Sequence, residues 1–305
     1  MLARILLSTL AVALAAGAAV APARGGTILP YTADAHTLHL YHFDETSGAA
    51  DPGTPFADAT LGTALAFTNT GGPDGRDNSG GGGYGGAAYA GFGSALDALA
   101  AGSGTYHGST SSVGGGVATA AVAQSALQGA GGAFTYEAIV RLTDTTGEQE
   151  ILSHDGSTSR GFLFRILNGT LAFYSGAAAF SATIPTTGGH AIVANEWFHA
   201  AVTYSGEEGA TDNLTFYWTR LDSGVHEANA IGTALMAADV ANASNPLGAG
   251  TTTRNPFRFE VKGMLDEVRI SDTARGADDF LFAPEPSTLA LVVLGGLAAI
   301  RRSRR

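Results

Sequence analysis

Three histidines spaced three residues apart are the first side chains in the sequence that could bind a metal. His36, His39 and His42 would share one side of a helix, where three imidazoles could hold a zinc ion. On a β-strand only His36 and His42 share a face, and six residues at about 3.3 Å each keep them roughly 20 Å apart. If the segment is a strand, one ion cannot bind both, and we expect packed or solvated histidines.

Three aromatic residues could contact a sugar. Trp197, Tyr174 and Tyr217 alternate with Phe198, Phe173 and Phe216, so they should point to the opposite faces of their strands. Outward aromatic rings can stack on sugar rings as they do on lectin surfaces. The alternative is that they pack beneath an insertion. We predict Trp197, Tyr174 and Tyr217 as ligand-binding residues.

The segments that hold these residues alternate with a period of two, as half-buried strands do. Asn168-Gly169 is a hairpin signal between two of them. Many short strands with Gly, Asn and Asp turns indicate an all-β antiparallel sandwich. The clearest alternation lies in residues 134–142, 162–166, 170–174, 197–204, 214–218, 257–261 and 264–270.

Composition limits the function classes. The chain has 305 residues, no cysteine and a formal charge of −11. The lack of cysteine excludes disulfides and thiolate metal sites. The negative charge argues against nucleic-acid binding. Residues 71–116 are so rich in Gly and Ser that we interpret them as a surface insertion, partly ordered at best. We therefore expect one domain from 24 to 283 that carries this insertion.

Both ends of the chain are apolar. Arg4, an apolar run and Ala21-Pro22-Ala23 have the anatomy of a secretory signal peptide over residues 1–23, with its signal helix. At the other end, Leu289–Ile300 is apolar but shorter than the roughly 20 residues of a membrane span. The basic cluster Arg301, Arg302, Arg304 and Arg305 should stay in the cytoplasm. We expect a short C-terminal hydrophobic helix that holds the chain transiently at the inner membrane.

Pro284, Glu285 and Pro286, followed by that helix and the arginines, resemble the PEP-CTERM sorting signal of Gram-negative bacteria that make extracellular polysaccharide. The resemblance implies that an exosortase recognises the motif and removes residues 284–305. It implies an exported protein, released or attached at the cell surface or in the extracellular matrix.

Several stretches of the body resemble the laminin-G-like, concanavalin A-like jelly rolls of bacterial surface proteins. They are LHLYHFDETSGAADPG, the strand with Trp197, His199, Ala201, Thr203 and Tyr204, and the closing GMLDEVRI, Gly263 to Ile270. The resemblance covers about Ala35 to Phe280 and implies a concanavalin A-like sandwich.

The same resemblance implies a calcium ion at a sheet rim, since laminin-G-like domains often hold one. Asp44, Asp51 and Asp266 are the candidate ligands, because the family places the strands of Asp44 and Asp266 side by side. Met264, Asp266, Val268 and Ile270 alternate, which predicts that Asp266 points inward, where an unpaired carboxylate is costly. Calcium or backbone N–H groups would offset that cost.

Glycoside hydrolases also use this fold, and those that resemble its endoglucanase branch carry Glu-x-Asp-x-x-Glu on one strand. Here Glu148, Glu150 and Asp155 lack that spacing, and Gly147 indicates a loop. We therefore expect no enzyme, but an exported surface protein that binds polysaccharide or another surface component. The alternatives are a glycan hydrolase and a purely structural matrix protein.

Overall fold

The computed structural model describes residues 27–45, 57–60, 62, 66–67, 86–98, 117–156, 159–221, 225, 227–253 and 259–283. The described residues form strands and one short 3-10 helix, η2 (Gln124–Ala126). Within these ranges, no helix has the length and apolarity needed to span a bilayer. The predicted signal peptide and the predicted sorting signal from Pro284 onward lie outside them.

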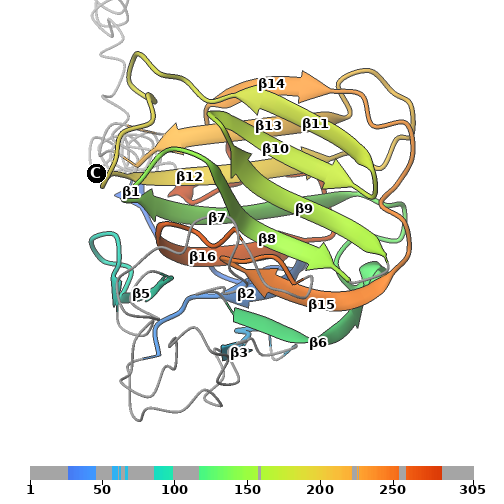
Figure 1. Ribbon diagram of the computed structural model, residues 1–305, viewed down its shortest axis with the longest axis horizontal. Coiled ribbons are helices and arrows are strands. Elements are labelled where there is room, and N and C mark those ends of the chain that lie inside the picture. The colour runs from blue at the N-terminus through green and yellow to red at the C-terminus, as the bar shows by residue number, and fades with distance from the viewer. Residues whose placement is uncertain are drawn as a thin grey trace, which may run out of the picture.

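Two antiparallel sheets lie face to face (Figure 1). The seven-stranded sheet has the order β11 (Ala178–Thr183), β10 (Thr170–Ser175), β9 (Arg160–Leu167), β8 (Glu148–Asp155), β15 (Ser244–Ala249), β6 (Val117–Ala123) and β3 (Ala66–Phe67). The eight-stranded sheet has the order β14 (Ala230–Ala234), β13 (Leu214–Arg220), β12 (Trp197–Tyr204), β7 (Phe134–Leu142), β16 (Gly263–Ser271), β5 (Ser94–Asp97) and β4 (Gly86–Ala87), and β2 (Thr37–Tyr41) also pairs with β16. This arrangement confirms the predicted all-β sandwich.

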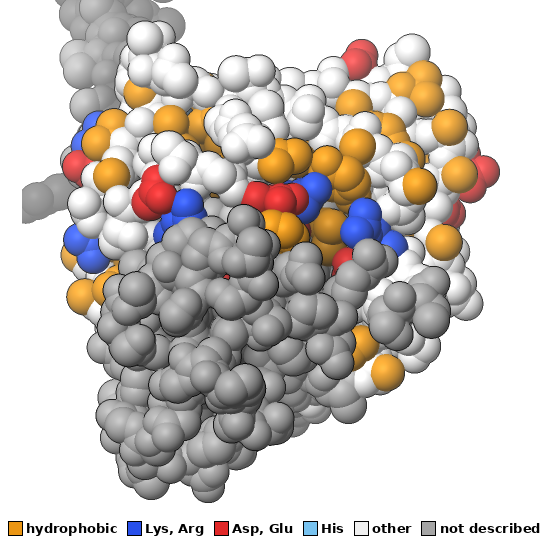
Figure 2. Space-filling view, viewed as in Figure 1, with side chains coloured by type: hydrophobic (Ala, Val, Ile, Leu, Met, Phe, Trp, Pro, Cys, Tyr) orange, Lys and Arg blue, Asp and Glu red, His pale blue; other side chains and the backbone are white. Residues whose placement is uncertain are grey.

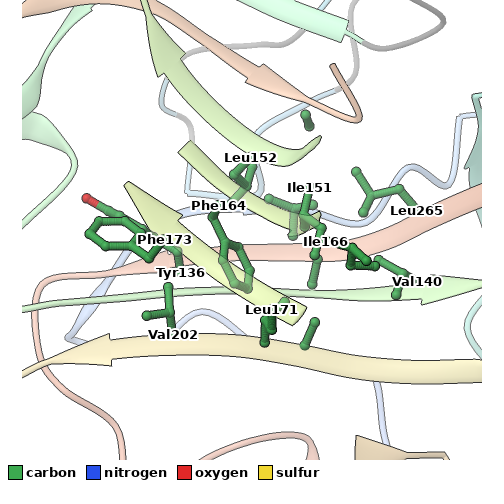
Figure 3. Packing of buried hydrophobic residues seen from close by; sticks show 14 of the residues in the cluster. Tyr136, Val140, Ile151, Leu152, Phe164, Ile166, Leu171, Phe173, Val202 and Leu265 are labelled. Atoms are coloured by element: carbon green, nitrogen blue, oxygen red, sulfur yellow. The ribbon is translucent and has the colours of Figure 1, made fainter. Parts of the chain in front are cut away.

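The main core fills the space between the two sheets (Figure 3). Alternate residues of β7, β9 and β12 point into it, as their period-two pattern predicts. Phe134, Tyr136, Phe162 and Phe173 stack on one another with ring centroids 4.3 to 6.1 Å apart. These aromatic contacts join the two sheets at the centre of the sandwich.

The predicted hairpin between β9 and β10 is confirmed. Asn168 and Gly169 both have positive φ angles, 47° and 82°, which is the conformation of a tight two-residue turn whose twist matches the strands. The turn sets the register in which Phe173 pairs with Phe164 and Ala172 pairs with Arg165. Core-facing residues of β9 therefore lie beside core-facing residues of β10, and outward-facing residues lie beside outward-facing ones.

A second buried cluster lies on the outer side of the eight-stranded sheet. Tyr31, Ile139, Tyr217 and Phe280 belong to it. The segments that follow β1 (Thr27–Ile28) and precede β17 (Phe282–Ala283) cover this face, and the two strands pair with each other. The two ends of the described chain thus meet at one place.

An ionic network lies beneath this cover. Glu137 is fully buried and accepts hydrogen bonds from Arg269 at 2.6 Å and from the Tyr31 hydroxyl, and it contacts His199 at 3.1 Å. Burial alone would raise the pKa of Glu137, but Arg269 and His199 outweigh it and lower the pKa to about 2. The carboxylate therefore stays charged inside the protein.

The predicted inward direction of Asp266 is wrong. Leu265 and Val268 both face the main core, and between them β16 contains a bulge in which Glu267 has a φ of 50°. The bulge adds one residue, so Asp266 pairs with Ile139 and points to the outer side, opposite Val268 and Ile270. The alternation of Met264, Asp266, Val268 and Ile270 breaks at this point.

Two of the weaker local predictions also need correction. Residues 94–97, within the Gly-rich region, form β5 and extend the sheet edge at Met264 and Leu265. Of the predicted strand at 257–261, the described residues 259–261 lie outside the strands.

Candidate functional site

The outer face of the seven-stranded sheet gathers charged side chains around one tyrosine. Glu150 on β8 pairs with Arg165 on β9, and Arg165 pairs with Ala172 on β10. Tyr174 follows Ala172 by two residues and therefore projects from the same face. We call the group formed by Glu148, Glu150, Asp155, Arg160, Arg165 and Tyr174 the Tyr174 cluster.

Arg165 is the centre of the cluster. Its Nη1 donates to Glu150 Oε1 at 3.2 Å and to Glu148 Oε1. Its guanidinium lies over the Tyr174 ring, 4.2 Å from the ring centre, a geometry in which cation and π system attract. The residue is only 8% exposed, so these contacts hold it in a fixed position.

Arg160 adds a second positive charge beside the same ring. Its guanidinium carbon lies 5.9 Å from the centre of Tyr174, and its Nε lies 3.5 Å from Asp155 Oδ1. A quarter of its side chain is exposed, 26%. The cluster thus contains both a buried and an accessible arginine.

Glu150 is fully buried, and its Oε2 atom has no hydrogen-bond partner. Burial raises the pKa of this carboxyl group to about 8, although the charge of Arg165 opposes the shift. At neutral pH Glu150 is therefore mostly a neutral acid. A neutral carboxyl group can donate one hydrogen bond as well as accept.

Figure 2 shows this face, where acidic and basic side chains lie side by side next to hydrophobic ones. The neighbouring edge strand β11 contributes small exposed residues, Ala179 and Ser181, to the same face. Tyr174 is partly exposed, and no bulky side chain stands beside it on β11. The described residues of β11 therefore leave that side of the ring uncovered.

The three predicted aromatic residues do not come together. All three point away from the main core, but Trp197 and Tyr217 belong to the eight-stranded sheet. Tyr217 is 8% exposed and packs edge-on against Phe280, with 5.1 Å between ring centres. Of the three, Tyr174 alone lies on the seven-stranded sheet, where its partly exposed ring could contact a ligand.

Glu148, Glu150 and Asp155 lie on strand β8, not in a loop as predicted. Gly147, with a φ of 81°, makes the turn that precedes the strand. Glu148 and Glu150 are two residues apart and so share the outer face. Sequence reasoning missed Arg165, although its position between the core residues Phe164 and Ile166 already indicated an outward cation.

The predicted calcium ligands are only partly described. Asp51 lies outside the described residues, and Asp44 accepts a hydrogen bond from Ser94 N at 2.8 Å. Asp266 is fully buried with Oδ2 unpaired, and burial, followed by the Glu267 charge, raises its pKa to about 10.

The oxygens near Asp266 do not by themselves make a calcium site. Calcium needs six to eight oxygen ligands, and both Glu267 oxygens are already engaged, by His42 and by Tyr31 N. In the described part of the chain, no group of three or more His, Asp or Glu side chains could hold a metal ion. The residues described here therefore do not fit the ion, and calcium binding stays a prediction.

The three histidines each contact a different carboxylate. His36 contacts Asp272 at 2.9 Å, and His39 contacts Asp58 and His42 contacts Glu267, both at 2.7 Å. β2 begins at Thr37 and includes His39. Each histidine thus has its own carboxylate partner, and His39 lies on a strand, as the strand interpretation predicts.

A family model described as the concanavalin A-like lectin/glucanases superfamily matches residues 114–279, more than half of the chain. The chain belongs to this superfamily. The matched range includes every residue of the Tyr174 cluster.

Several solved structures are similar to this chain at low identity. A proposed carbohydrate-binding protein from Bacteroides ovatus is 17% identical with a TM-score of 0.34, and the match covers 48% of this chain and 39% of that one. The CBM40 module of an IT-sialidase from Ruminococcus gnavus, bound to α2,3-sialyllactose, is 12% identical with a TM-score of 0.37, covering 49% and 80%. A Trypanosoma rangeli sialidase in complex with sialic acid is 13% identical with a TM-score of 0.46, covering 84% and 35%.

This chain thus spans well under half the length of the first and third of these proteins. Similarity at this level carries no conclusion about this chain. Among curated proteins, no sequence matches the chain.

This concanavalin A-like domain also lacks the Glu-x-Asp-x-x-Glu pattern of endoglucanases. Strand β8 is where its sequence comes nearest to that pattern. β8 carries Glu148-x-Glu150-x-x-Ser153, and a bulge between Glu150 and Leu152 returns Ser153 to the outer face. Ser153 donates its hydroxyl to Thr251 O at 2.8 Å. β8 therefore presents two carboxyl groups and one hydroxyl group at this spacing.

Proposed function

We propose that this domain binds a glycan, without catalysis, at the Tyr174 cluster. The superfamily contains lectins as well as glucanases by its description. Sugar recognition needs an aromatic surface for the apolar side of the ring and fixed polar groups for the hydroxyls. The Tyr174 cluster offers both on one accessible face.

The observation that carries the proposal is the stacking of Arg165 on Tyr174 between two glutamates. These contacts fix the ring and leave it partly exposed beside the small residues of β11. Because the polar groups are held in place before binding, a ligand would lose less free energy in ordering them.

A glycan array followed by calorimetry on the purified protein tests the proposal. We expect Tyr174→Ala to weaken binding by about tenfold, since an aromatic contact is worth about 0.5–1.5 kcal/mol beyond the area it buries. Trp197→Ala is the matched control, because Trp197 is a half-buried aromatic on the other sheet. Loss of binding in Trp197→Ala alone would move the site to that sheet, and no binding to any glycan would leave a structural matrix role.

A glycan hydrolase is the second candidate, favoured by one observation. Glu150, whose pKa burial raises to about 8, lies next to Glu148, and a carboxyl group of this kind could donate a proton to a leaving group. Arg165 binds both groups, which would oppose their reaction with a substrate. Release of new reducing ends that stops in Glu150→Gln would favour hydrolysis, and we expect none.

Delivery to the cell surface is the second part of the proposal. The predicted signal peptide and the predicted exosortase signal imply export with a transient stop at the inner membrane. Mass measurement of the protein extracted from the surface would test it, because a C-terminus that still contains Arg305 contradicts processing.

A further inference from the structure

Two arginines flank a single partly exposed ring in an otherwise acidic protein. Arg165 and Arg160 lie 4.2 and 5.9 Å from the centre of Tyr174, whereas the whole chain has a formal charge of −11. A protein with this charge repels acidic ligands over most of its surface. A local pair of cations is therefore a specific feature of this face.

Neither arginine uses all of its donors. The Nε–H groups of Arg160 and Arg165 are both buried and both lack an acceptor. An unpaired buried donor is costly, more so in a charged group. A ligand with a negatively charged acceptor near the ring would remove that cost once the arginine side chains shift enough to expose these atoms.

The acidic residues of the cluster balance this positive charge but do not exceed it. Glu150 is mostly neutral at pH 7 because burial raises its pKa to about 8, which leaves Glu148 and Asp155 against the two arginines. Glu148 binds Arg165 through Nη1, and Asp155 approaches Arg160 Nε only to 3.5 Å. The accessible part of Arg160 is thus available to an external anion.

We propose that the Tyr174 cluster selects glycans that carry a carboxylate, such as uronic or sialic acid residues. The inference rests on the glycan binding proposed above. The sugar ring stacks on Tyr174, and its carboxylate accepts hydrogen bonds from Arg160 and, after a small shift of the side chain, from Arg165. A planar carboxylate matches the donors of a guanidinium group in geometry as well as charge.

The test is an array that holds uronate- and sialate-containing oligosaccharides, each beside its carboxyl-reduced counterpart. We expect binding to at least one acidic glycan and a loss of about tenfold or more when its carboxyl group is reduced. Arg160→Gln should weaken binding of the acidic glycan by a similar factor, and Arg160→Lys should restore part of it.

Arg220→Gln is the matched control, since Arg220 pairs with Glu196 on the other sheet at 3.0 Å and its side chain is one-third exposed. It should leave binding unchanged. Equal binding of acidic and carboxyl-reduced glycans would overturn the carboxylate inference and leave glycan binding intact. Binding of neither form would overturn both, and an equal loss in Arg220→Gln would show that only overall charge matters.

Discussion

Glu150 lies directly opposite Arg165 across the β8–β9 pair, and none of it is exposed to solvent. The pairing places a neutral acid beneath an arginine that is stacked on Tyr174. The proposed glycan site is therefore supported from below by a group that changes charge near neutral pH.

Glu150 should make the protein less stable as the pH rises. Its pKa is about 8 in the folded protein against an ordinary value of 4.5, so between these values the folded state binds more protons than the unfolded state. The free energy of unfolding should fall across this window by on the order of 1–3 kcal/mol. Urea unfolding at pH 4.5, 6 and 8 should show a shallower decline in Glu150→Gln than in the wild type, and an identical decline would contradict the raised pKa.

Asp266→Asn should stabilise the protein at pH 7 in the presence of a chelator. Asp266 has a pKa of about 10 against an ordinary value of 3.8, so at pH 7 folding requires proton uptake, which the amide avoids. We expect a gain of about 2–4 kcal/mol at pH 7 and almost none at pH 4. The measurement is chemical unfolding at both pH values.

The same variant tests the calcium prediction. If calcium binds at Asp266, it should raise the melting temperature of the wild type and lose that effect in Asp266→Asn. A wild-type melting temperature that does not respond to calcium argues against the ion.

Glu137→Gln should destabilise the protein strongly. The change leaves Arg269 buried without its charged partner, at a cost of about 3–5 kcal/mol. Glu196→Gln breaks the exposed pair with Arg220 and should cost less than about 1 kcal/mol. Thermal unfolding of the two variants compares a buried ion pair with a surface ion pair. Equal losses of stability would mean that the buried network contributes no more to stability than the surface pair does.

Phe173→Ala should open a cavity between the sheets. Phe173 is fully buried and packs against Phe134, Tyr136 and Phe162, so its truncation should cost about 3–5 kcal/mol. Leu235, which is 46% exposed, provides the control: Leu235→Ala should change the free energy of unfolding by less than about 0.5 kcal/mol. Calorimetry on both variants checks the difference.

Alternation in the sequence was enough to predict the fold, because each long strand has one face against the main core. Tyr136, Phe164 and Val202 all lie where the period of two places them. The rule failed at Asp266, where the bulge at Glu267 shifts the pattern by one residue. Glutamate has no preference for a positive φ, so nothing local in the sequence marks that bulge.

The candidate site was harder to predict for a different reason. Tyr174 was found from its alternation with Phe173, but the same argument also selected Tyr217, which Phe280 covers. Whether an outward ring is covered depends on segments that are distant in sequence, and the alternation within one strand says nothing about them. The pairing of Arg165 with Glu150 depends in turn on the register of β8 and β9, which is set by the turns between the strands.

The pairing of Thr27 with Ala283 has a mechanical consequence. A force applied to both ends of the domain would first act on the two-residue ladder of β1 and β17, and on the bond from Leu29 N to Leu281 O. Because the strands are antiparallel and their outer ends adjoin, the load would open these hydrogen bonds one at a time. The ladder would yield under a weak pull before tension reached the sandwich, so a tethered copy could extend slightly while its two sheets stayed folded.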